Sequence, residues 1–98
     1  MKHFFVEITY TAEPKQMAAI RPEHRAYVQS GYERGLLLLS GPQKPMTGGL
    51  VVARAKSKQE VERFFAFDPY RLNGVAIYRF VEFTPVFFQP FLENWMKS

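Results

Sequence analysis

The chain contains no cysteine and only two histidines among its 98 residues. The lack of cysteine excludes disulfide bonds, thiolate nucleophiles and thiolate metal ligands, and with so few histidines we expect no metal and no cofactor. The sequence also lacks an apolar run of the roughly 20 residues that a membrane-spanning helix requires, and no secretory signal precedes the first strand-like segment. These absences predict a cytoplasmic protein that has no membrane partner.

The length and composition of the chain are those of one globular domain. The chain is long enough for one hydrophobic core and too short for two, so we expect a single domain over residues 1–98. Hydrophobic residues make up 47% and charged residues 22%, which is typical of folded chains and not of disordered ones. Thirteen Lys and Arg against nine Asp and Glu leave a net charge of +4.

Hydrophobic periodicity divides the chain into strands and helices. Four strands are predicted, over residues 3–10, 36–40, 50–55 and 75–83, and helical patterns follow the first and the third of them. The order β-α-β-β-α-β is that of the ferredoxin-like α+β fold. In this fold, both helices cover one face of a four-stranded antiparallel sheet.

Prolines and a glycine set the boundaries predicted for the first helical region. A helical stretch opens at Pro14, but Arg21 is expected to break it, because the residue before a proline is disfavoured in the α region. Pro22 is then the first residue of the main helix, and Gly35 ends that helix in a left-handed cap. The inward stripe of the main helix is predicted to be His24, Tyr27, Val28 and Gly31.

Both faces of the predicted sheet are apolar. Residues 36–39 and 50–52 do not alternate with polar residues, whereas a sheet with one wet face should alternate. A second copy of the chain is the simplest cover, and two-fold dimers are the commonest oligomers. We therefore expect a homodimeric α/β barrel, in which a core over 1–83 is followed by an aromatic extension over 84–98 that reaches the partner. The alternative is a monomer whose extension folds back over its own sheet.

Few side chains are suited to catalysis, and no glycine-rich phosphate loop or nucleophile elbow is present. His24 lies on the inward stripe, where an imidazole can exchange a proton near neutral pH. The structural alternative is a histidine that is hydrogen-bonded to a backbone carbonyl. Asp68, directly before Pro69, has the pattern of a helix N-cap. From these residues alone, the structural interpretation is favoured for both.

The positive net charge is compatible with RNA binding, and ferredoxin-like sheets also form RNA-recognition modules. Those modules stack bases on aromatic residues of their central strands. The predicted strand over residues 50–55 carries no aromatic residue, and the basic residues are scattered along the chain. The pattern therefore argues against a nucleic-acid partner.

Several short motifs, taken in order and spacing, resemble the YciI-like family of small proteins. They are Arg21–His24, Gly35–Leu37, Ser40–Pro42, Asp68–Tyr70 and Gly74. The resemblance extends from the first strand to about Phe83 and implies a ferredoxin-like fold that forms a dimeric α/β barrel. It also implies that His24 and Asp68 form an active-site pair. A related member is a lyase that removes chloride from a chlorinated hydroxymuconate, although most members have no assigned reaction.

On this resemblance, Asp68 is expected to accept a hydrogen bond from one ring nitrogen of His24. The other nitrogen then faces a pocket as general acid or base. Contacts to a small carboxylated substrate are expected from Arg21, Ser40 and Tyr70. The implied function is cofactor-free lyase or isomerase chemistry, by proton transfer or elimination. The alternative is a non-catalytic homodimer that binds a small ligand or a partner, in which both residues are structural.

Overall fold

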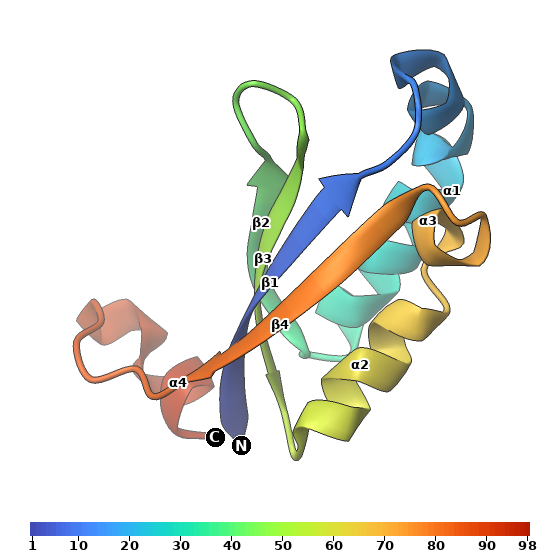
Figure 1. Cartoon of the computed structure of the whole chain (residues 1–98). Helices are drawn as coiled ribbons and strands as arrows, with labels where there is room; N and C mark the ends of the chain where they lie inside the picture. The colour runs from blue at the N-terminus through green and yellow to red at the C-terminus, as the bar shows by residue number, and fades with distance from the viewer.

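The computed structural model describes all 98 residues and has helices packed on one face of a four-stranded sheet (Figure 1). The strands are β1 (Lys2–Tyr10), β2 (Leu37–Pro42), β3 (Gly48–Ala55) and β4 (Ala76–Phe83). The helices are α1 (Pro14–Glu33), α2 (Lys58–Ala66), α3 (Pro69–Leu72), the 3-10 helix η1 (Pro90–Leu92) and α4 (Glu93–Lys97). All pairings are antiparallel, in the order β2-β3-β1-β4. The predicted ferredoxin-like α+β class is confirmed.

The hydrophobic core lies between the sheet and helices α1 and α2. Phe4, Val6 and Ile8 are buried on one side of β1, because alternate residues of a strand point to the same face. The buried side chains of α2 are Val61, Phe64 and Phe65. None of the helices is both long enough and apolar enough to cross a membrane.

Helix α1 runs without interruption through Pro22, so the predicted break at this residue is wrong. A proline inside a helix removes a backbone hydrogen bond and costs about 3 kcal/mol. Here the helix is packed against the rest of the protein on both sides of the proline, with Met17 and Gly31 buried. Packing of this kind outweighs local preference. The unbroken helix carries Arg21 on the same side as His24, three residues later.

The end of α1 is as predicted. Gly35 has a φ of +72°, which is the left-handed conformation that favours glycine. Its N–H donates to the carbonyl of Tyr32 and the N–H of Leu36 donates to the carbonyl of Gly31, both at 2.9 Å. This is the Schellman motif, and it turns the chain directly from α1 into β2.

The face of the sheet away from the helices carries an apolar row. The strand register places Leu39, Val52, Phe5 and Val81 side by side across all four strands. Leu39 and Phe5 are exposed. The single chain therefore leaves much of this row open to solvent.

The extension after β4 folds back over one end of this open face. Figure 1 shows η1 and α4 on the side of the sheet opposite α1 and α2. The ring of Trp95 packs against His3, with 5.5 Å between the ring centroids, and Arg54 donates to the Trp95 carbonyl at 2.9 Å. By contrast, Phe87 and Phe91 are 96% and 83% exposed. The extension thus packs partly on its own sheet and leaves two aromatic rings free.

Candidate active site

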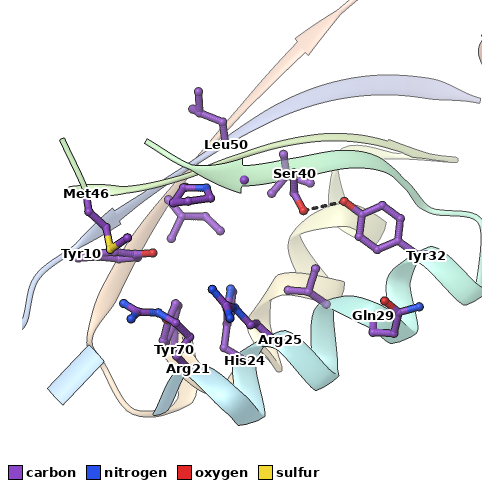
Figure 2. Close-up of a pocket in the computed structure, with 16 residues that line it drawn as sticks. Tyr10, Arg21, His24, Arg25, Gln29, Tyr32, Ser40, Met46, Leu50 and Tyr70 are labelled. Atoms are coloured by element: carbon purple, nitrogen blue, oxygen red, sulfur yellow. Dashed lines mark hydrogen bonds between the residues drawn. The ribbon is translucent and has the colours of Figure 1, made fainter. Parts of the chain in front are cut away.

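A pocket of about 360 Å³ lies between α1 and the sheet (Figure 2). Helix α1 forms one wall, and strands β1, β2 and β3 form the other. Figure 2 shows Tyr10 and Tyr70 at one end of the pocket and Tyr32 with Ser40 at the opposite end. The side chains from α1 are Arg21, His24, Arg25, Val28, Gln29 and Tyr32.

His24 and Asp68 lie 44 residues apart in the chain and are in direct contact. Nδ1 of His24 donates to Oδ1 of Asp68 at 2.7 Å, which gives the neutral ring its proton on Nδ1. The one buried side-chain polar atom without a hydrogen-bond partner is Nε2 of His3. Nε2 of His24 has no hydrogen-bond partner in the protein either, but this atom is not buried, and His24 lines the pocket. Nε2 of His24 is therefore open to the pocket. The contact that the resemblance implied is therefore present.

The carboxylate of Asp68 is fully buried and accepts hydrogen bonds from three donors. Besides His24, the backbone N–H of Tyr70 donates to Oδ1 at 3.0 Å, and the phenol of Tyr78 donates to Oδ2 at 2.8 Å. The bond from Tyr70 makes Asp68 the N-cap of α3. The Asp68 side chain therefore caps α3 and bonds His24 at the same time. With both oxygens bonded, the carboxylate is held in one orientation.

Tyr70 supports the pair from one side. Its ring stacks on the imidazole of His24, and its hydroxyl accepts a hydrogen bond from Nε of Arg21 at 3.2 Å. Burial raises the pKa of Tyr70, although the bond from Arg21 opposes this shift. Tyr70 was expected to contact substrate. It lines the pocket but is only 1% exposed, so its contacts are mainly with His24 and Arg21.

The pocket is basic. Arg21, His24 and Arg25 line it, no acidic residue does, and neither arginine forms a salt bridge. The hydrogen bond with Tyr70 raises the pKa of Arg21, so its guanidinium stays charged. Arg21 and Arg25 are therefore like charges one helical turn apart, an arrangement that destabilises a helix. No group of three His, Cys, Asp or Glu side chains is placed to hold a metal ion.

Ser40 lies at the other end of the pocket, away from His24 (Figure 2). Its hydroxyl is hydrogen-bonded to the hydroxyl of Tyr32 at 2.6 Å. The predicted site residues therefore all line or support one pocket, with Arg21 and Tyr70 beside His24 and Ser40 apart from them.

Sequence reasoning missed Arg25, Tyr32 and Tyr78. The first two lie in the predicted main helix, beside His24 and one turn after Val28, so widening the predicted inward stripe by one position finds them. Tyr78 faces the helices because it pairs with Ile8 of β1. Alternation along β4 was the only signal for it, and alternation does not reveal its contact with Asp68.

Comparison with solved structures supports the fold. The chain is similar to 5-chloro-2-hydroxyhydroquinone dehydrochlorinase from Burkholderia phenoliruptrix AC1100, solved in complex with 2,5-dihydroxybenzoquinone. The TM-score is 0.64 at 22% sequence identity, and the match covers 79% of this chain and 90% of that chain. At this level of identity the likeness shows a shared fold.

Comparison of sequences identifies the family. A search of curated protein sequences finds no match to the chain. Residues 2–84, which span the strands β1 to β4 and the helices between them, match the model of the YCII-related domain. The residues of η1 and α4 lie outside the match. The chain therefore belongs to the YCII-related family.

Proposed function

We propose that the protein is a cofactor-free enzyme that transfers a proton on a small carboxylated substrate, in a lyase or isomerase reaction. His24 is the general acid–base, and Asp68 orients it. The observation that carries this proposal is the 2.7 Å hydrogen bond between them at the wall of an open pocket. A hydrogen-bonded histidine–carboxylate pair beside a cavity is a recurrent feature of active sites.

The reacting atom is Nε2 of His24. Because Asp68 holds the proton on Nδ1, the neutral ring presents a lone pair at Nε2 and can take a proton from a carbon next to a carbonyl. The buried carboxylate then stabilises the imidazolium that forms. The electron pair left on the substrate either expels a leaving group or accepts the proton at another atom. Acid–base assistance of this kind contributes roughly a hundredfold to ten-thousandfold in rate.

The arginines supply the expected anchor for a carboxylate. Arg21 donates to Tyr70 through Nε, which leaves its two terminal nitrogens for a ligand. Arg25 lines the same pocket and has no salt-bridge partner. A guanidinium binds a carboxylate through two parallel hydrogen bonds. The hydroxyls of Ser40 and Tyr32 offer a second polar contact at the other end.

The structural neighbour gives this proposal limited support. That protein is named as a dehydrochlorinase, and elimination is one of the two reaction types proposed here. Fold-level likeness does not transfer a reaction by itself. The proposal therefore depends on the geometry of His24 and Asp68.

Hydrogen–deuterium exchange tests the reaction class before the substrate is known. Small carboxylated ketones are incubated in D2O with the protein, and loss of the proton next to the carbonyl is followed by NMR. We expect exchange with the unmodified protein and a loss of roughly a hundredfold or more in His24→Gln. Exchange that persists in His24→Gln contradicts the assignment of the base. A panel in which no compound exchanges favours the non-catalytic alternative.

We further propose that two copies pair through the open face of the sheet. The apolar row that includes Phe5 and Leu39 supports this, because large exposed apolar patches commonly mark interfaces. Sedimentation at micromolar concentration tests it, with Phe5→Glu as the disruptive variant. The matched control is Phe67→Glu, an equally drastic change at an exposed phenylalanine that follows α2. We expect a dimer for the unmodified chain and the control and a monomer for Phe5→Glu. A monomeric unmodified chain contradicts the proposal.

A further inference from the structure

We infer that Tyr78 is a positioning residue of the active site, which acts through Asp68 to hold the proton of His24 on Nδ1. This inference rests on the proposed function. The phenol of Tyr78 donates to Oδ2 of Asp68 at 2.8 Å, and Nδ1 of His24 donates to Oδ1 of the same carboxylate. Three side chains are thus linked in sequence: Tyr78 from β4, Asp68 from the residue before α3, and His24 from α1.

The two oxygens of Asp68 have different partners. Oδ1 accepts from His24 and from the backbone N–H of Tyr70, whereas Oδ2 accepts from Tyr78 alone. Asp68 is fully buried, so water cannot replace a lost donor without a change in the structure. Removal of the Tyr78 hydroxyl leaves Oδ2 unpaired. The carboxylate is then free to turn about its Cβ–Cγ bond to share its remaining donors, and the bond to His24 is the one without a backbone restraint.

The surroundings of Tyr78 keep its hydroxyl a donor in a fixed place. Burial, together with the neighbouring charge of Asp68, raises the pKa of Tyr78 far above its usual range, so the phenol stays protonated. The centroid of its ring lies 5.7 Å from that of Phe65, and the guanidinium of Arg71 lies 5.8 Å from the centroid of the Tyr78 ring. These contacts fix the ring whether or not the hydroxyl is present.

Tyr78 acts at a distance from any ligand. It does not line the pocket, and neither does Asp68. An effect of Tyr78 on reactions in the pocket must therefore pass through the carboxylate to His24. This separates a positioning role from a direct role in binding.

The test compares Tyr78→Phe with Tyr27→Phe as a matched control. Tyr27 is a partly buried tyrosine whose hydroxyl donates to the backbone carbonyl of Phe64, and it does not line the pocket. The readout is the ¹⁵N NMR spectrum of the His24 ring, which reports which nitrogen carries the proton. We expect Tyr27→Phe to leave the proton on Nδ1 and Tyr78→Phe to give a mixture of both tautomers. In the exchange assay, we expect Tyr78→Phe to lower kcat by about 10- to 100-fold with KM nearly unchanged.

Asp68→Asn, measured in parallel, distinguishes failure of this inference from failure of the proposed function. If Asp68→Asn changes the tautomer of His24 and Tyr78→Phe does not, the pair stands and Tyr78 has no positioning role. If neither variant changes it, the proposed function fails as well. Should Tyr78→Phe not fold, site-specific 3-fluorotyrosine at position 78 replaces it. A more acidic phenol donates more strongly, so the His24 proton signal must shift; an unchanged signal overturns the inference.

Discussion

The rings of Tyr70 and His24 lie face to face, with centroids 3.9 Å apart and planes inclined by 11°. On another side, Tyr70 meets the ring of Tyr10 edge-on at 5.5 Å, and its hydroxyl accepts the bond from Arg21. Its backbone N–H bonds Asp68. One residue therefore places the imidazole, the carboxylate that bonds it and one guanidinium of the pocket. Substitutions that remove the hydroxyl of Tyr70, or its whole ring, should separate these contributions.

Replacing Tyr70 by Phe keeps the stacked ring and removes the acceptor of Arg21. We expect this variant to lose about 1 kcal/mol of stability or less, because one partly exposed hydrogen bond is lost. Tyr70→Leu also removes the ring, and we expect a loss of about 2–4 kcal/mol from the cavity that it leaves. Urea denaturation measures both. Equal stabilities for the two variants contradict a supporting role for the ring.

Gly31 lies where α1 packs tightly against the side chains of Leu37 and Phe64. A Cβ at this position would lie 2.7 Å from side-chain atoms of both Leu37 and Phe64, which are buried. Gly31→Ala should therefore destabilise the protein by about 1–3 kcal/mol through overpacking, despite the better helix propensity of alanine. Gly41→Ala is the control, because a Cβ there meets nothing within 4 Å, and we expect a change within about 0.5 kcal/mol. An increase in thermal stability on Gly31→Ala contradicts this prediction.

His3 should make the stability of the protein depend on pH. Burial, with the N-terminal ammonium and the guanidinium of Arg54, holds the pKa of His3 below its ordinary value of 6.5. The unfolded chain therefore takes up this proton at a higher pH than the folded protein. The contribution of neutral His3 is fully present above pH 6.5 and is lost progressively as the pH falls towards the lower, folded pKa.

Denaturation curves at pH 7.5 and at about pH 5.5 measure this effect, with His3→Gln as the comparison. The difference between the two proteins isolates His3 from His24, which is present in both. Trp95 is the only tryptophan and lies against His3, so its fluorescence reports the same change locally. Parallel pH dependence in the two proteins contradicts the prediction.

The fold was predictable because its signals are local and repeated. Alternation in β1 and the apolar stripe of α2 each extend over several residues. Gly35 marks a helix end through its left-handed backbone, and Asp68 marks a helix start through its capping side chain. The break predicted at Pro22 shows the limit of such reasoning. Local preference disfavours a helix there, but burial of Met17 and Gly31 on either side depends on contacts that no local pattern reports.

The site was less predictable than the fold. The residues alone favoured structural roles for His24 and Asp68, and only the family resemblance paired them. Their contact spans 44 residues and depends on how α1 and α3 pack together. Arg25 was missed because the predicted inward stripe, which includes His24 and Val28, was drawn too narrowly. Tyr78 was missed because the partner of a strand residue on a neighbouring helix follows from packing and not from alternation.

Because the chain has only two histidines, the stacking of His24 on Tyr70 makes the two imidazoles easy to distinguish by proton NMR. The imidazole of His24 lies over the face of one aromatic ring, where circulating π-electrons move proton resonances upfield. The imidazole of His3 is tilted at 57° against an indole and experiences a different local field. The two sets of ring-proton lines should therefore be separate in a one-dimensional spectrum. A ligand that enters the pocket can then be detected by the change in chemical shift of a resolved His24 ring-proton signal.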